Sequence, residues 1–185
     1  MKYLLVGLGN IGFEYEGTRH NIGFDILDHL AAIKEVTFKQ DRLAYFAELA
    51  HRGRKVYLIK PTTYMNLSGK AVHFWMNKLD IPLKHVLVNV DDINLEFGRI
   101  RIRKQGSDGG HNGLKDIQSR IGTEYGRLRV GVGSEFSKGQ QADYVLSKWS
   151  DEQNKKLPEI IAKAANANLD FVFRGFDYIL NNYNS

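Results

Sequence analysis

The chain contains no cysteine, which excludes disulfide bonds and a thiol nucleophile and is typical of proteins from a reducing compartment. It also lacks any stretch near the ~18 apolar residues that a membrane-spanning helix needs. The short apolar run at the N-terminus is interrupted by glycine and has no small-residue cleavage site of the kind that ends a signal peptide. We therefore expect a cytoplasmic protein with no membrane partner.

Several site motifs are missing as well. The sequence has neither a G-x-S-x-G nucleophile elbow nor a Walker A loop. Asp92, Asn94 and Glu96 have calcium-loop spacing, but the glycine and the glutamate that complete such a loop are absent. No pair of histidines has the i, i+4 spacing of a helical zinc site, since they occur at 20, 29, 51, 73, 85 and 111. We therefore expect no metal and no cofactor.

The composition is that of one globular domain spanning residues 1–185. Hydrophobic residues make up 43% and charged residues 25% of the chain, as in an ordinary globular protein. A length of 185 residues is enough to bury a sizeable core. The net charge of +5 is compatible with a polyanionic partner but does not require one.

A glycine-rich stretch, residues 7–23, follows the first apolar run and indicates a loop at the end of a strand. Gly7, Gly9 and Gly12 satisfy the G-x-G-x-x-G pattern of dinucleotide sites. That pattern requires a helix to open within the motif and an acid at the end of the next strand. Here the helical period begins only near Asn21, and Asp28 falls inside that helix, so a dinucleotide site is disfavoured.

Strand and helix patterns alternate along the chain. Period-two or wholly apolar segments predict strands over 3–6, 45–50, 56–60, 86–90, 99–104 and 127–132. Apolar residues at helical spacing predict helices over 21–35, 70–79, 114–121, from 150 onward, and over 169–183. A capping box of Ser150 and Gln153 begins the helical C-terminal part. The predicted fold is α/β, with a twisted, mixed and largely parallel sheet and helices on both faces.

Polar residues in the predicted strand-end loops suggest a hydrolase that activates water without metal. A histidine can take a proton from water, and a nearby carboxylate sets its tautomer. Asparagine amides can donate to a developing oxyanion. The candidates are Asn10, His20, Asn66, Asp91, His111 and Asn112. Asp91 is preferred to Asp92 because it directly follows the apolar strand, although an Asp-Asp pair there is also common as a turn or helix cap.

Two predicted strands, 99–104 and 127–132, place alternate arginines on one face. Together with the glycine loop between them, they resemble a surface that follows phosphates. Tyr15 and Tyr64 could stack on unpaired bases. The alternatives are a solvated charged face and half-buried packing rings.

Six spaced motifs carry a family resemblance. They read GLGN-x-G, Y-x-x-T-R-H-N-x-G, K-P-x-T-Y-M-N-x-S-G, V-x-V-D-D, G-G-H-N-G-L-K and R-L-R-V-G-V-G, in that order. From residue 3 almost to the C-terminus the chain resembles bacterial-type peptidyl-tRNA hydrolase. The resemblance implies a monomeric, metal-free α/β hydrolase whose partner is peptidyl-tRNA, and which cleaves the ester between the peptide and the 3′ ribose.

The resemblance also implies roles for individual residues. His20 would activate water, Asp91 would stabilise its proton-accepting form, and Asn10 would contact the first peptide unit. The tRNA 3′ end would be bound by Tyr15, Tyr64, Asn66 and Asn112, and the peptide groove would include Met65 and His111. The tRNA 5′-phosphate region would be held by Arg129 with either Arg103 or Lys104.

The chain departs from the family pattern at a few positions. Ile11 stands where proline is usual, Val90 where a polar residue is common, and 94–97 lacks the usual Asp-Leu-Pro-Pro character. These departures affect loop stiffness and leave every matched catalytic position in place. A non-catalytic RNA-binding relative of the same fold is the alternative function.

Overall fold

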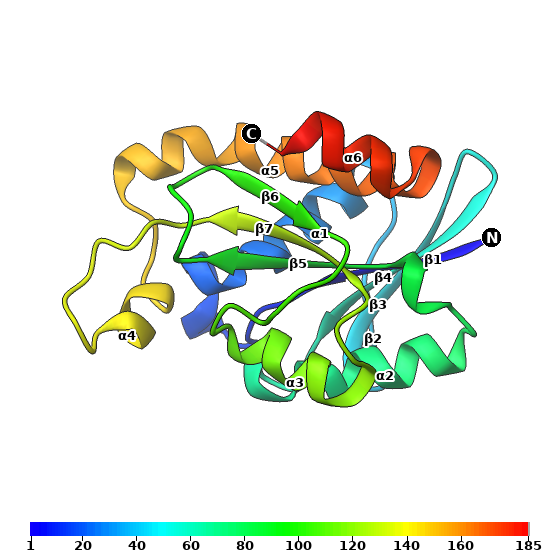
Figure 1. Cartoon of the computed structure of the whole chain (residues 1–185), viewed down its shortest axis with the longest axis horizontal. Helices are drawn as coiled ribbons and strands as arrows, with labels where there is room; N and C mark the ends of the chain where they lie inside the picture. The colour runs from blue at the N-terminus through cyan, green and yellow to red at the C-terminus, as the bar shows by residue number, and fades with distance from the viewer. Residues whose placement is uncertain (185) are drawn as a thin grey trace.

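The computed structural model describes residues 1–184, which form one mixed sheet flanked by helices (Figure 1). The strand order is β2-β3-β4-β1-β5-β7-β6. The four central strands β4, β1, β5 and β7 run parallel, whereas β2, β3 and β6 pair antiparallel at the two edges. The strands are β1 Lys2–Gly7, β2 Lys39–Asp41, β3 Ala44–His51, β4 Arg54–Pro61, β5 Val86–Asp92, β6 Ile100–Arg103 and β7 Gly126–Gly131. The predicted fold class is confirmed.

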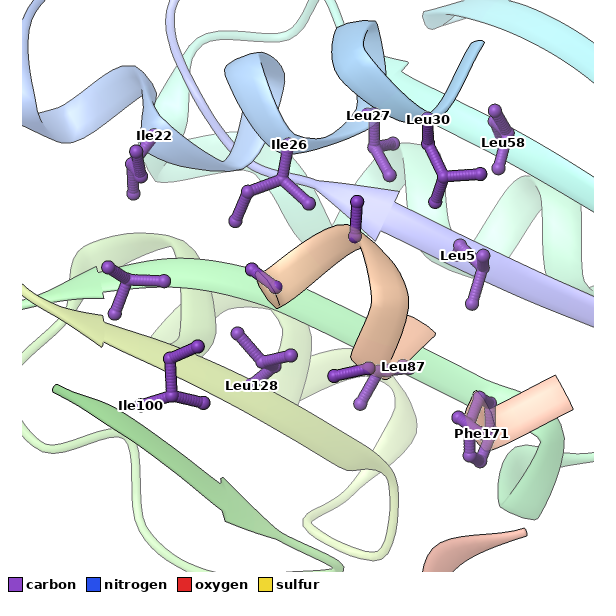
Figure 2. Packing of buried hydrophobic residues seen from close by; sticks show 14 of the residues in the cluster. Leu5, Ile22, Ile26, Leu27, Leu30, Leu58, Leu87, Ile100, Leu128 and Phe171 are labelled. Atoms are coloured by element: carbon purple, nitrogen blue, oxygen red, sulfur yellow. The ribbon is translucent and has the colours of Figure 1, made fainter. Parts of the chain in front are cut away.

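Helices cover both faces of the sheet. They are α1 Ile22–Ile33, α2 Ser68–Lys78, α3 Asn112–Ile121, α4 Gln141–Val145, α5 Asp151–Arg174 and α6 Phe176–Tyr183. One buried core joins the sheet to α1, α5 and α6, and Figure 2 shows the α1 side chains Ile26 and Leu30 in this core with Leu5, Leu87 and Phe171. A second core joins the other face to α2 and α3. No helix within residues 1–184 has the length and apolarity to span a bilayer.

Strand β5 lies inside the sheet, and six of its residues, Val86 to Asp91, are buried. This matches a strand covered on both faces, as its nearly continuous apolar sequence predicts. The one amide in its interior, Asn89, is paired with Asn168 of α5 by reciprocal hydrogen bonds of 3.0 and 2.8 Å. Asn89 also donates to the carbonyl of Val6, so one polar side chain links β5 to both β1 and α5.

Two glycines allow β1 and α1 to touch backbone to backbone. A Cβ added to Gly7 would lie 2.1 Å from the carbonyl oxygen of Gly23, and one added to Gly23 would lie 2.4 Å from the carbonyl oxygen of Asn89. Only residues without a side chain fit there. The segment after Gly12 forms two 3₁₀ turns, Phe13–Tyr15 and Arg19–Asn21, before α1 begins. No α-helix begins within the glycine motif, which agrees with the prediction that this motif is not a dinucleotide-binding site.

The structure differs from the predicted elements in several places. The short strand β2 and the five-residue helix α4 were not predicted, because neither is long enough to show a hydrophobic period. Helix α3 begins at Asn112, two residues earlier than predicted. The predicted last helix over 169–183 is split at Gly175, whose φ of 88° ends α5.

Replacing Asn168 with alanine is expected to lower the free energy of unfolding by about 1–3 kcal/mol, because the buried Asn89 amide loses its partner. Chemical denaturation measures the change. The matched control is Asn166→Ala, an exposed asparagine on the same helix, which should change the free energy of unfolding by no more than about 0.5 kcal/mol. Equal effects of the two substitutions would contradict a structural role for the amide pair.

Candidate active site

A cavity of about 600 Å³ opens where the parallel strands end. Ligands bind at this edge in α/β sheets because the loops that follow the carboxyl ends of the strands meet there. Ten of the twelve predicted site residues line this cavity, called the cleft below: Asn10, Tyr15, His20, Tyr64, Met65, Asn66, Asp91, His111, Asn112 and Arg129.

At the cleft, His20 meets Asp91. His20 lies on the 3₁₀ turn before α1, and Asp91 lies near the end of β5. The Nδ1 atom of His20 is 2.9 Å from Oδ1 and 3.0 Å from Oδ2 of Asp91. Because an ionised carboxylate only accepts hydrogen bonds, Nδ1 carries the proton. The lone pair of Nε2 is then left to accept a proton from water.

Charge and burial act in opposite directions on this pair. Burial lowers the pKa of His20, but the charge of Asp91 and its hydrogen bond outweigh that effect and raise the pKa above its ordinary value of 6.5. Burial alone would raise the pKa of Asp91, but His20 and His111 hold it well below its usual range. Asp91, only 3% exposed, is therefore an ionised carboxylate inside the protein.

His111 is the second partner of Asp91. Its Nε2 atom lies 2.9 Å from Oδ1 of the carboxylate. Its Nδ1 atom accepts hydrogen bonds from the backbone N–H groups of Gly113 and Leu114, at 3.1 and 3.3 Å, and so caps α3. An Nδ1 that accepts leaves the proton on Nε2, which donates it to Asp91. The sequence placed His111 beside the peptide but gave no sign of this contact.

The same three side chains form a possible metal-ligand set. Ligand atoms of His20, Asp91 and His111 lie within 4.8 Å of one another. A metal would need the lone pair of His111 Nε2, since that is the nitrogen directed at Asp91. That nitrogen bears the proton, because the N-terminus of α3 occupies the lone pair of Nδ1. The arrangement fits a hydrogen-bonded triad and does not fit a metal site.

Asn10 is held by two neighbouring loops. Its backbone N–H donates to Oδ1 of Asn21 at 2.8 Å, and its carbonyl accepts from Nδ2 of Asn21 at 2.9 Å. Its side-chain Oδ1 accepts from the backbone N–H of Met65 at 2.7 Å. With Oδ1 engaged, the remaining side-chain donor of Asn10 is Nδ2, which has no hydrogen-bond partner among residues 1–184. Asn21 has no predicted role, yet it orients this residue.

The rim of the cleft carries exposed side chains. Tyr64 has a φ of 60° and is 51% exposed. Positive φ is unfavourable for a tyrosine and is often found at binding sites. Asn66 and Asn112 are also exposed. These groups are accessible to a ligand that enters the cleft.

The basic residues divide into two groups. Arg129 lines the cleft, donates to the carbonyl of Ser107 at 2.7 Å and lies 3.7 Å from Asp92. Arg103 and Lys104 do not line it, and Lys104 pairs with Asp177 of α6 at 2.9 Å. These two residues lie outside the cleft in the structure.

The chain is similar to known proteins over nearly its whole length. Residues 4–185 match the family model described as peptidyl-tRNA hydrolase. The chain belongs to the peptidyl-tRNA hydrolase family. It is 52% identical to the peptidyl-tRNA hydrolase of Cytophaga hutchinsonii, covering 100% of this chain and 99% of that protein, and 49% identical to that of Phocaeicola vulgatus, with the same coverage. The predicted family is confirmed.

Solved structures show the same fold. The peptidyl-tRNA hydrolase of Acinetobacter baumannii is 34% identical and has a TM-score of 0.93, covering 99% of this chain and 94% of that chain. A uridine phosphorylase from Vibrio fischeri, 10% identical with a TM-score of 0.53, shares the fold alone.

One interpretation of the arginine strands is wrong. Arg127, expected with Arg129 on a phosphate-following surface, is wholly buried. It lies over the ring of Tyr125 at 4.1 Å and donates to the carbonyl of Thr123 at 3.1 Å. The glycine loop approaches it, since a Cβ on Gly106 would lie 3.4 Å from its guanidinium. The alternation along a strand predicts on which face of the sheet a residue lies, but not which other segments cover that face.

Arg19 is a residue whose role the sequence did not indicate. It is 7% exposed and precedes His20. Its guanidinium bonds Ser147, the carbonyl of Lys148 at 2.9 Å and Gln153 at 2.9 Å, and lies 4.2 Å above the ring of Tyr144. The segment thus held includes α4 and the residues after it, and supplies the far wall of the cleft through Gln141, Ala142, Val145 and Leu146.

Replacing Asp91 with asparagine should lower the pKa of His20 below 6.5, because burial then acts without the opposing charge. An NMR titration of the histidine ring protons measures the midpoint, which in the unaltered protein should lie above 6.5. Asp92→Asn is the control, since Asp92 bonds the N–H of Asn94 and approaches Arg129 instead of His20. A midpoint that stays in place in Asp91→Asn would refute the assigned coupling.

Proposed function

We propose that this chain hydrolyses the ester between a peptide, or another N-blocked aminoacyl group, and the 3′ ribose of tRNA, with His20 as the base that activates water. The observation that carries the proposal is the His20–Asp91 hydrogen bond, 2.9 Å long, within a cleft lined by the matched family residues. Membership of the peptidyl-tRNA hydrolase family supports the substrate class.

The reaction needs one proton to be moved twice. Nε2 of His20 takes a proton from water while the oxygen of that water attacks the ester carbonyl. The resulting imidazolium is stabilised by the charge of Asp91. Collapse of the tetrahedral intermediate breaks the bond to the 3′ oxygen, which receives the proton from His20. Free tRNA and the peptide acid leave, the acid releases its proton to solvent to become a carboxylate, and His20 returns to its starting form.

Asn10 and His111 assist in different ways. The free Nδ2 group of Asn10 donates to the first peptide unit, because its Oδ1 is bound to Met65. His111 donates to Asp91 and keeps the carboxylate in place, and with Met65 it borders the peptide groove. Neither the proton transfers nor the recognition of the ester requires a metal or cofactor.

The tRNA is held at two places. Its 3′ end is bound by Tyr15, Tyr64, Asn66 and Asn112, whose rings stack on unpaired bases and whose amides bond the polar edges of the bases. Arg129, with Arg103 or Lys104, binds the 5′-phosphate region. The exposed ion pair of Lys104 with Asp177 contributes little to stability, so Lys104 can exchange this carboxylate for a phosphate at a small cost in free energy.

Residues 1–185 act as one domain, as a monomer, in the cytoplasm where translation supplies the substrate. The alternative, a non-catalytic RNA-binding relative, predicts salt-sensitive RNA binding without ester cleavage.

The purified protein should release free tRNA from N-acetyl-aminoacyl-tRNA, and should do so equally in excess chelator, because no step uses a metal. Acid-gel separation of charged and free tRNA measures the rate. Intact substrate after prolonged incubation, together with RNA binding, would replace the proposal with the non-catalytic alternative.

His20→Ala should reduce kcat by roughly 10²–10⁴-fold through loss of general-base catalysis. KM should change by only a few-fold, since His20 contributes to the chemistry and not to holding the tRNA. His73→Ala removes an exposed histidine of α2 and should keep both constants. A His20→Ala variant with normal kcat would exclude this residue as the base.

A further inference from the structure

A second cluster of cations lies at the opposite end of the sheet. It surrounds a cavity of about 260 Å³ formed by the β3–β4 turn and the C-terminal ends of α5 and α6, lined by His51, Arg52, Asn166, Leu169, Asp170, Phe173, Arg174 and Tyr183. Strand β4 leads from this turn toward the cleft, and its eight residues span roughly 25 Å at about 3.3 Å per residue. Figure 1 shows the cyan β3–β4 turn at the end of the molecule away from α4.

Three guanidinium groups gather around one ring. Those of Arg52, Arg54 and Arg174 lie 4.7, 5.2 and 5.7 Å from the ring centroid of Phe173. The ammonium group of Lys34, at the end of α1, lies 3.0 Å from Nδ1 of His51. Such contacts with a ring hold the guanidinium planes in place without consuming their N–H donors.

These cations are poorly neutralised. Within the described residues, Lys34, Arg52 and Arg54 form no salt bridge. The carboxylate that lines the cavity, Asp170, accepts a hydrogen bond from the Tyr183 hydroxyl at 2.6 Å and lies 3.8 Å from Arg174. Its charge is therefore directed at α5 and α6, and the hairpin side of the cavity keeps its excess positive charge.

The pKa of His51 is affected by these positive charges. Burial and the positive charges of Lys34, Arg52 and Arg54 lower its pKa, and Asp170 opposes them only in part. Like charges held together in this way repel one another, and an anion placed among them removes the repulsion. Arginine in particular matches the oxygens of a phosphate with two parallel N–H groups.

We propose that the cluster formed by Arg52, Arg54 and Arg174 around Phe173, with Lys34 beside His51, is a second phosphate-binding site, and that its ligand is the backbone of RNA. RNA is favoured because the chain belongs to a family named for a tRNA substrate, and because Phe173, an aromatic residue that is 36% exposed, lies beside the cations and can stack on a base. This site contributes affinity for the body of an RNA and takes no part in ester hydrolysis.

The first experiment uses a blunt RNA duplex, which lacks the single-stranded 3′ end that the cleft recognises. Fluorescence anisotropy gives its affinity as a function of salt for the unaltered protein, for Arg52→Gln with Arg54→Gln, and for the control Lys84→Gln with Lys163→Gln. Both pairs remove two positive charges, and the control lysines are exposed and outside the cluster. In the cluster variant the fall of log K with log salt should become shallower by roughly two, because each lost phosphate contact removes about 0.9 or less from the slope. The control should keep its slope.

Equal slopes and affinities in the two paired variants would overturn the proposal. Thermal unfolding checks that each variant is folded, and the single variant Arg52→Gln, an exposed turn residue, provides the same comparison if the pair unfolds. In the single variant the slope should fall by roughly one.

The second experiment follows the His51 ring by NMR. Addition of the duplex should raise its titration midpoint, since a phosphate offsets the neighbouring cations. Inorganic phosphate and a mononucleotide, added at the same concentration of phosphate groups, should have a much smaller effect. A response to these small anions as large as that to the duplex would assign the site to a free phosphate compound, and no response to any of them would reject an anion site.

Hydrolysis provides an independent readout. The Arg52→Gln and Arg54→Gln pair should keep kcat on N-acetyl-aminoacyl-tRNA, whereas His20→Ala should keep the salt dependence of duplex binding. Failure of the proposed hydrolysis would thus leave the RNA site standing, and failure of the RNA site would leave the hydrolysis standing. A fall in kcat in the arginine variant would contradict a site separate from the chemistry.

Discussion

The arrangement of the cleft depends on the hydrogen bonds that the buried carboxylate of Asp91 accepts. An ionised acid inside a protein is costly unless hydrogen bonds compensate it, and here two imidazoles donate to the same oxygen. Each imidazole comes from a different loop, and His111 also caps a helix. One charge thereby joins β5, the turn before α1 and the start of α3, so the chemistry and the folding of these loops share the same bonds.

Two contacts in the surrounding fold fix the backbone positions of His20 and Asp91. Contact between Gly7 and Gly23 places the turn that carries His20 directly over the end of β1. The amide pair of Asn89 and Asn168 ties the strand that carries Asp91 to the long helix α5. Both contacts fix the position of the backbone. This explains how the side chains of His20 and Asp91, 71 residues apart in the sequence, meet within 3 Å.

Much of this could be predicted from the sequence. Hydrophobic periodicity gave the alternation of strands and helices, and the strand-end rule together with the motifs gave most of the cleft residues. What periodicity could not give were contacts made by polar groups between distant segments. The bond from His111 to Asp91, the burial of Arg127 under the glycine loop and the orientation of Asn10 by Asn21 depend on the tertiary path of loops. Short elements such as α4 also escaped, because five residues carry no detectable period.

Arg19 gives the molecule a mechanical property. Its side chain attaches the segment 144–153 to the residue immediately before His20. Outward movement of this wall of the cleft therefore pulls, through Arg19, on the turn that carries His20 and on its hydrogen bond to Asp91. The width of the cleft is thereby coupled to the position of the His20 imidazole.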